Sequence, residues 1–320
     1  MDESGPRATG ILPAVPGTPY HLQQRTPQHR WWRTLLSFPV LAALGIAMAV
    51  LAVGALNGLA VLFGVASGAD GFADPLWELA VAFLSIAALL PAVLLTARWV
   101  QRRPVGTLSS VRGRLRWRWM ARCAAWALLG FAAVVAIDLV RGVESDAGAW
   151  PGWPRFASIV AVCVVAVPLQ AAAEEYLCRG FLLQGFASWF RTPWPGAVLT
   201  ALAFVVLHEY EDPLVLVDLF IFAMAMSWLV IRTGGLEAAI ALHVVNNLVS
   251  ALVAAPRGVP PLDQTGDYAV WDVLPTTVLT LVYAWWIARC YRGGDRSARS
   301  GRALDPAESA ATGDRGAAGG

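Results

Sequence analysis

The sequence contains few charged residues. Only 14% of its 320 residues are Asp, Glu, Lys or Arg, and 57% are hydrophobic, whereas an ordinary soluble domain carries about 25% charged residues. A soluble domain of this size could not bury so much apolar surface, because about half of any folded surface stays in contact with water. The composition therefore excludes a single soluble globule and a wholly disordered chain. It indicates a polytopic membrane protein.

Lysine is absent and cysteine is scarce. All 24 basic residues are arginines, and the formal net charge is only +2, so the charge balance indicates no nucleic-acid partner. The four cysteines form no C-x-x-C pair and lie in or beside apolar segments. We interpret them as free thiols rather than as a disulfide or zinc framework.

The two ends of the sequence lack long apolar runs. Residues 1–30 are rich in Pro, Gly, Thr and Gln without a helical period, which predicts a flexible cytoplasmic tail. No apolar stretch typical of a cleavable signal peptide follows the first residues. Residues 293–320 have a similar composition and predict a disordered cytoplasmic tail. The segment between them, residues 31–292, is predicted to form a membrane helix bundle.

Eight apolar runs lie between these tails. A helix that crosses a bilayer needs about 20 mostly apolar residues, and helices are expected because lipid offers no partner to an open backbone. The runs cover residues 38–66, 76–100, 120–140, 156 to beyond 174, 195–208, 214–231, 236–255 and 273–291. They predict an all-α polytopic bundle of about eight transmembrane helices with an intramembrane polar pocket.

The arginines gather in alternate connecting segments. Residues 1–33, the link at 98–122 and the C-terminal segment hold most of them, whereas the other links hold few arginines and more acidic residues. By the positive-inside rule, this asymmetry predicts a protein of the cell membrane with both termini cytoplasmic. The arginines at 98–122 are best explained by topology and by contact with lipid headgroups.

Ionisable side chains inside apolar runs are energetically expensive, so each of them suggests a functional site. The fourth, fifth and seventh runs hold most of the polar residues: Glu174, Glu175, Arg179, His208, His243, Asn246 and Asn247. The alternative is that they form only an ion-pair network and interhelical hydrogen bonds. Asp218 in the sixth run is interpreted as structural or interfacial.

Helical spacing indicates which of these side chains meet. Residues four positions apart share a face of a helix. Glu175 is therefore expected to pair with Arg179, whereas Glu174 points to a different face without its own cation. By the same spacing, Phe204 packs beside the imidazole of His208.

The remaining polar residues extend this pocket. His243 and Asn247 share a helix face, and Asn246 is a near neighbour of both. Side chains from three helices can thus converge, because Glu174 and His208 belong to the other two.

This set of residues suits hydrolysis. A carboxylate near a histidine can orient and deprotonate a water molecule, and a second histidine with an asparagine amide can donate hydrogen bonds to an oxyanion. Activated water is the more economical interpretation, because no Ser or Cys is obviously placed as a nucleophile. Glu174, His208 and His243 could also hold Zn²⁺ or another divalent metal. The residues alone leave both chemistries open.

The order of these motifs resembles the CPBP family of intramembrane proteases, also called the CAAX-protease and bacteriocin-processing or Abi family. That family carries E-E-x-x-x-R, F-x-x-x-H and H-x-x-x-N in separate helices. Here they read Glu174-Glu175-Tyr-Leu-Cys-Arg179, Phe204-Val-Val-Leu-His208 and His243-Val-Val-Asn-Asn247. The resemblance covers roughly residues 156–255.

The resemblance implies an eight-helix bundle and an intramembrane endopeptidase. Glu174 and His208 would activate water, and His243 and Asn247 would stabilise the oxyanion. Glu175 and Arg179 would support the site, with Phe204 and Asn246 beside it. The resemblance favours a metal-free glutamate mechanism over a metalloprotease. The eukaryotic relatives cut prenylated C-a-a-X proteins, and bacterial relatives are linked to bacteriocin maturation, self-immunity or maturation of membrane proteins.

A membrane-associated protein or peptide is therefore the expected substrate, and membrane lipid the expected surroundings. Two other functions are considered: a non-catalytic peptide-binding scaffold or bacteriocin self-immunity protein, and an ion-coupled transporter. The transporter predicts repeated halves, which the sequence does not show. The predicted span boundaries conflict with a shared pocket. They place Glu174 near the cytoplasmic face and His208 about 20 Å above the start of its run, so ideal helices would put the two residues at different depths in the membrane. The sequence selects neither a particular substrate nor an oligomeric state.

Overall fold

Long apolar helices dominate the computed structural model, which describes residues 11–65, 67–68, 71–72, 74–141, 150–208, 210–260, 262 and 268–291. Seven helical segments in this part of the chain are long and apolar enough to cross a membrane: Trp31–Leu62, Pro75–Trp99, Trp117–Val140, Trp153–Ala187, Pro213–Thr233, Glu237–Arg257 and Val270–Cys290. The expected polytopic helix bundle is therefore confirmed.

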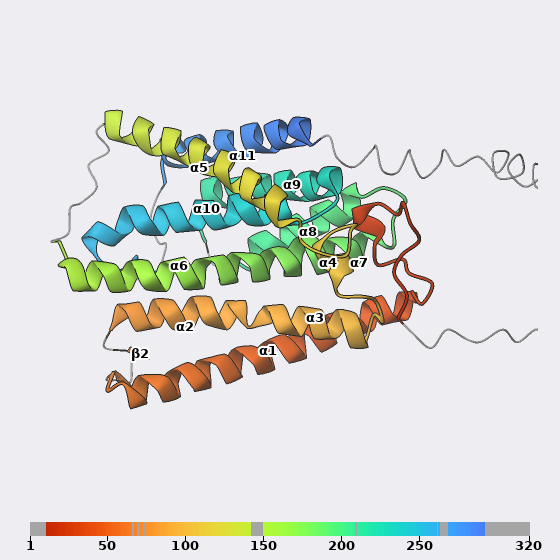
Figure 1. The fold of residues 1–320 in the computed structure, drawn as a ribbon, viewed down its shortest axis with the longest axis horizontal. Helices are drawn as coiled ribbons and strands as arrows, with labels where there is room; N and C mark the ends of the chain where they lie inside the picture. Colours follow the sequence, from red (N-terminus) through yellow and green to blue (C-terminus); the bar gives the residue numbers. More distant parts are fainter. Residues whose placement is uncertain are drawn as a thin grey trace, which may run out of the picture.

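The helices follow one another back and forth through the bundle (Figure 1). Their bounds are α1 Trp31–Leu62, α2 Pro75–Ala87, α3 Leu89–Trp99, α4 Gly106–Ser109, α5 Trp117–Val140, α6 Trp153–Glu175, α7 Leu183–Ala187, α8 Trp194–Val206, α9 Pro213–Thr233, α10 Glu237–Ala254 and α11 Val270–Cys290, with the short helical turns η1 Tyr20–Leu22 and η3 Ala255–Arg257. The strands β1 Ser67–Gly68 and β2 Gly71–Phe72 pair antiparallel between α1 and α2.

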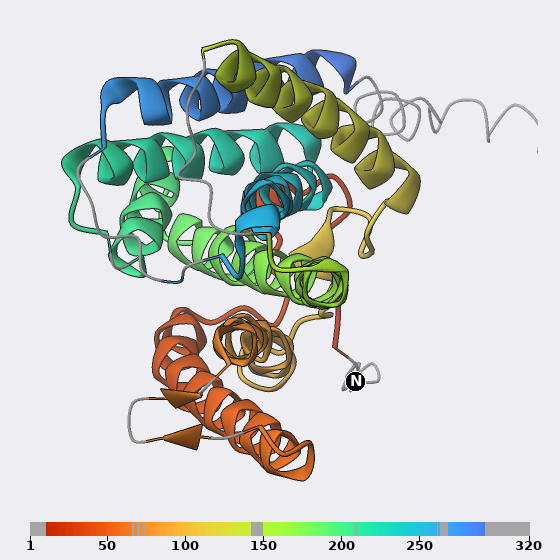
Figure 2. The same ribbon diagram turned by 90° about the vertical axis from the view of Figure 1, so that its left-hand side faces the viewer.

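The helices pack in an order that encloses α6 and α10. Helix α1 packs on α2 and α3, and α2 packs on α6. Helix α10 packs on α5, α6 and α9, while α8 and α11 both pack on α9 (Figure 2). Polar side chains on the inward faces of α6 and α10 are therefore shielded by protein on several sides.

The outer faces of the bundle are apolar. Ile46 and Leu51 on α1, Leu129 on α5 and Val282 on α11 are all exposed. A soluble protein would not present so many large apolar side chains to water, whereas lipid accommodates them without cost. These faces are consistent with a membrane environment.

Helix α8 is shorter than the sequence suggested. It has 13 residues, fewer than the roughly 20 that a full span needs, so the fifth apolar run, at 195–208, forms a short helix instead of a full span. Gly196, near its start, lies against the backbone of α7, where an added Cβ would come within 2.7 Å of the Ala187 nitrogen. The missing side chain thus allows α8 to turn back closely along the preceding helix.

The helical span that begins with α6 continues past Glu174, as the fourth apolar run predicted. It continues without interruption through η2, a π-helical segment at Tyr176–Leu182, into α7, and the three segments form a single span of 35 residues. At 1.5 Å per residue, Glu174 lies about 20 Å from the end of α7. His208 lies a similar distance, about 20 Å, from the start of α8. The two residues therefore lie at matching depths, and the conflict in the sequence prediction is removed.

Residues 11–30 form an ordered segment packed on the bundle, which corrects the prediction of a flexible tail for that stretch. Tyr20 is 1% exposed, and its hydroxyl donates to the carbonyl oxygen of Leu108. The Arg25 guanidinium donates to the carbonyl oxygens of Ser188 and Phe190, in the turn between α7 and α8. Residues 1–10 and the predicted tail at 293–320 lie outside the described residues.

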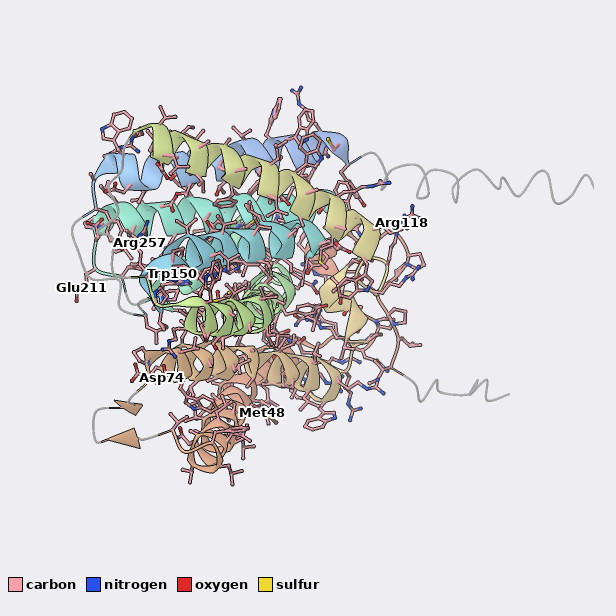
Figure 3. All side chains as sticks on the ribbon, turned by 60° about the vertical axis from the view of Figure 1, so that its left-hand side comes forward. Met48, Asp74, Arg118, Trp150, Glu211 and Arg257 are labelled. Carbon is pink, nitrogen blue, oxygen red and sulfur yellow. The ribbon has the colours of Figure 1, made fainter. Side chains whose placement is uncertain are left out.

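The start of α1 and the end of α11 lie at the same end of the bundle (Figure 1). Arg118 is at this end, whereas Asp74, Trp150 and Glu211 are at the opposite end (Figure 3). The bundle thus separates an arginine-rich end from an end that holds acidic residues.

Candidate active site

A buried ion cluster joins α6, η2 and α10. Arg179 Nη1 donates to Glu175 Oε1 at 2.9 Å, and both side chains are completely buried. His243 Nδ1 lies 2.8 Å from the same carboxylate oxygen. The pairing expected from the four-residue spacing of Glu175 and Arg179 is present, and the structure adds the histidine from a distant helix.

The Arg179 guanidinium also lies over aromatic rings. Its Cζ atom is 4.4 Å from the centroid of the Phe204 ring and 5.7 Å from that of Phe222. A cation over an aromatic face is stabilised by the ring quadrupole, most strongly where water is excluded. This contact connects the buried ion cluster to α8 and α9.

Glu174 has different surroundings from Glu175. Its side chain is 15% exposed, whereas that of Glu175 is 0% exposed. The Oε1 atom of Glu174 accepts a hydrogen bond from Gln170. Its Oε2 atom lies 3.5 Å from His243 Nε2 and has no hydrogen-bond partner within the described part of the chain. Glu174 is therefore the more accessible carboxylate of the two.

Three side-chain amides lie beside Glu174. Asn247 Nδ2 donates to Gln170 Oε1 at 3.3 Å, and Asn246 Nδ2 donates to Asn247 Oδ1 at 2.9 Å. The sequence analysis did not include Gln170. The available signal was a polar residue in an apolar run, one helical turn before Glu174 and so on the same face.

His208 lies just beyond α8 and against Phe204. The two ring centroids are 4.4 Å apart, so the expected packing is present. Nδ1 of His208 lies 2.7 Å from the Phe204 carbonyl oxygen. Because a carbonyl oxygen can only accept, Nδ1 carries a proton, and in the neutral ring Nε2 holds the lone pair.

Phe204 contacts both histidines of the site. Its ring centroid is 4.4 Å from that of His208 and 6.3 Å from that of His243. Residues from α6, α8 and α10 are thus brought together around one polar site, as the sequence motifs suggested. The catalytic roles of the individual residues remain a proposal.

The tautomer of His243 limits what its ring can do. A carboxylate only accepts hydrogen bonds, so the contact with Glu175 requires a proton on Nδ1. In the neutral ring Nε2 is then an acceptor. His243 can therefore donate a hydrogen bond from Nε2 only when the ring carries a second proton.

The predicted metal ligands do not form a metal-binding group. A catalytic zinc ion is held by three protein ligands at about 2 Å. Across the described ranges, no three His, Cys, Asp or Glu side chains are arranged to hold a metal ion. The alternative in which Glu174, His208 and His243 hold a divalent metal ion stays a prediction.

Other sequence expectations concern residues next to the site. Asp218 accepts a hydrogen bond from Thr277 of α11, which is consistent with a structural role. The four cysteines are free thiols. Cys178 is buried in an apolar cluster with Ala201, Phe204 and Ala223, so its thiol is held among apolar side chains.

Comparison with known proteins identifies the class to which this site belongs. Residues 155–249 match the family model described as type II CAAX prenyl endopeptidase Rce1-like. This range contains all three motifs and therefore the residues of the polar site. This region is therefore similar to the type II CAAX prenyl endopeptidases, in agreement with the resemblance of the three motifs.

Two bacterial proteins are similar to the chain. The uncharacterized protein YyaK of Bacillus subtilis (strain 168) is 27% identical over 240 residues, which cover 71% of this chain and 80% of the relative. An uncharacterized 24.3 kDa protein of Escherichia coli is 42% identical over 72 residues, covering 22% of this chain and 33% of the relative. No solved structure matches the chain significantly.

Proposed function

We propose that the protein is an intramembrane endopeptidase that hydrolyses a peptide bond of a membrane-associated protein or peptide. Water activated by Glu174 and His208 is the proposed nucleophile, without a metal ion. The observation that carries this proposal is the contrast between two adjacent glutamates. Glu175 is completely buried and its Oε1 atom is bonded to Arg179 and His243, whereas Glu174 is 15% exposed and its Oε1 atom accepts from the neutral amide of Gln170.

In the proposed reaction, Glu174 Oε2 takes a proton from water while the water oxygen bonds to the substrate carbonyl carbon. His208 Nε2 accepts the other hydrogen of the water and orients its attack. The carbonyl electron pair moves to oxygen as the tetrahedral intermediate forms. When the C–N bond breaks, Glu174 returns the proton to the leaving nitrogen. The products are a carboxylic acid and an amine, so atoms and charges balance.

The oxyanion is proposed to lie beside α10. Asn247 Nδ2 has two hydrogens, of which one goes to Gln170, so the second is available to the oxyanion. His243 would donate from Nε2 as an imidazolium. The positive charges of Arg179 and His243 would then balance the two carboxylates in a site of low dielectric, where uncompensated charge is costly.

The arginine-rich end of the bundle supports a cytoplasmic location for both termini. Arg118 lies at that end and Asp74 at the other (Figure 3).

The experiment that tests this function compares protein termini in membranes that contain the wild type or Glu174→Ala. We expect new peptide termini only with the wild type, because the variant lacks the proposed base. Glu78→Ala on α2 is the matched control, since it removes a glutamate outside the site. The proposal is overturned if Glu174→Ala produces the wild-type termini. It is also overturned if the folded wild-type protein produces no new termini in bacterial cells that carry a similar protein and therefore its membrane proteins.

A further inference from the structure

Gln170 lies between two residues of the proposed machinery, although it belongs to none of the three motifs. It is 5% exposed and occupies α6, one helical turn before Glu174. Its Nε2 group donates to Glu174 Oε1, and its own Oε1 accepts from Asn247 Nδ2. One side chain thus contacts both the proposed base and the proposed oxyanion donor.

The direction of these hydrogen bonds is set by chemistry. An ionised carboxylate can only accept, so Gln170 must turn its NH₂ group toward Glu174. Its carbonyl oxygen then faces Asn247, which must turn its own NH₂ group toward Gln170. The carbonyl of Asn247 is left for Asn246, whose Nδ2 donates to it at 2.9 Å. The three amides form a directed chain that ends on Glu174.

This chain affects both carboxylate oxygens of Glu174 and both hydrogens of Asn247. Because Gln170 occupies Oε1, Oε2 is the oxygen that remains for water. Because Gln170 Oε1 takes one hydrogen of Asn247, the amide plane of Asn247 is fixed and its second hydrogen has a defined direction. Preorganised donors of this kind need no rearrangement at the moment of reaction.

We propose that Gln170 is a positioning residue that orients Glu174 and Asn247 together for hydrolysis. This inference rests on the proposed function, because it assigns the residue a role in that reaction. A purely structural role is the alternative, since a bond between Gln170 and Asn247 also ties α6 to α10. The two roles differ in which half of the glutamine side chain matters.

Two variants separate these roles in full-length protein reconstituted into lipid vesicles. Gln170→Leu removes both hydrogen bonds. Gln170→Glu keeps the length of the side chain and the acceptor for Asn247, but it removes the donor to Glu174. We expect both variants to lower kcat by about 10- to 100-fold, since small misplacements of reacting groups have effects of this size. KM should stay within about twofold of the wild type, because substrate contacts are unchanged.

Gln101→Leu is the matched control for loss of a buried glutamine. Gln101 donates to Ser37 and accepts from Arg103, away from the proposed site. This variant should lower the melting temperature in detergent without lowering kcat per folded molecule. Melting curves of all variants report how much of each effect is structural.

Combination with Asn247→Ala gives a second readout. If Gln170 acts through Asn247 and Glu174, the effects of the two substitutions should not add, because these residues act as a unit. The kcat of Gln170→Leu/Asn247→Ala should then be at most about threefold below that of the less active single variant. Gln101→Leu combined with Asn247→Ala should show independent effects on kcat.

Wild-type kcat in Gln170→Glu would overturn the positioning role, as would additive losses in the double variant. A parallel loss of melting temperature and activity with unchanged kcat per folded molecule would also overturn it. These outcomes bear on Gln170 only when the wild type cleaves the peptide and Glu174→Ala does not. The peptide is taken from the comparison of protein termini described above. If the purified wild type does not cleave it, the proposed function itself is contradicted.

Discussion

His243 of α10 contacts Glu175 of α6 through a 2.8 Å hydrogen bond. The donor is Nδ1–H, so the bond fixes both the tautomer and the direction of the imidazole. The opposite nitrogen, Nε2, consequently faces Glu174 Oε2 at 3.5 Å. The second glutamate of the motif therefore orients a histidine toward the first.

Replacement of Glu174 should abolish activity without unfolding the protein. We expect Glu174→Gln to lower kcat by about 100-fold or more, the scale of a lost general base. The melting temperature should stay close to that of the wild type, because Gln keeps the size of the side chain. Cleavage assays and melting curves on the same preparations measure both quantities, with Glu78→Gln as the control. Wild-type cleavage by Glu174→Gln would contradict the assignment.

Replacement of Glu175 should affect stability as well as activity. Glu175→Ala leaves the buried Arg179 without its carboxylate, and breaking a buried ion pair on one side costs about 3–5 kcal/mol. The expected result is a clear drop in melting temperature in detergent, together with loss of cleavage because His243 loses its acceptor. Glu78→Ala provides the comparison. An unchanged melting temperature for Glu175→Ala would argue against the pairing.

The pair between Asp74 and Arg155 predicts a pH-dependent contribution to stability. The Arg155 guanidinium donates to Asp74 and holds the pKa of the Asp74 carboxyl below its ordinary value of 3.8. The stabilisation is therefore complete above pH 3.8 and is lost as the pH falls through the lowered pKa of the folded state. Because both side chains are about one third exposed, we expect it to be at most about 1 kcal/mol.

Melting curves of wild type and Asp74→Asn at several pH values measure this contribution. Asp74→Asn should melt at a lower temperature at neutral pH. The difference should shrink as the pH falls below the ordinary aspartate pKa, because the unfolded state binds the proton first, and it should vanish once the pH is below the lowered pKa of folded Asp74. A difference that grows in acid would show that the pair is not its source.

The N-terminal segment should contribute to the stability of the bundle. Arg25 donates to the carbonyl oxygens of Ser188 and Phe190 at 2.7 and 3.0 Å, so it satisfies backbone acceptors after α7. We expect Arg25→Gln to lower the free energy of unfolding by about 1 kcal/mol, because the bonds are charged but partly in contact with solvent. Melting temperature in detergent is the measurement.

Arg30→Gln is the control for this change. It alters the same charge in the same segment, but Arg30 donates only locally, to the His29 carbonyl oxygen. Its melting temperature should match that of the wild type. Equal effects of the two substitutions would indicate a general influence of charge rather than the contacts of Arg25.

Contacts within one helix could be predicted from spacing. Glu175 and Arg179 meet because they are four residues apart on a continuous helix, and Phe204 reaches His208 for the same reason. Helical periodicity fixes such pairs whatever the surroundings. The apolar runs likewise predicted the membrane bundle, because lipid requires helices of a minimum length.

Contacts between helices required the tertiary structure. His243 bonds to Glu175 across 68 positions of sequence, and Asn247 bonds to Gln170 across 77. No local pattern shows which faces of two helices will meet, so Gln170 was missed. The sequence predicted that the helix continues past Glu174, but not that residues Tyr176–Leu182 would be π-helical.

The sequence by itself thus determined a helical membrane protein with polar motifs in three apolar helices, because composition and periodicity act locally. The tertiary structure decided how those helices align. It brought His243 of α10 to the Glu175 carboxylate and packed residues 11–30 onto the bundle. The physical reason is that interhelical packing depends on side-chain shape and hydrogen-bond partners from distant segments, which no single segment of the chain encodes.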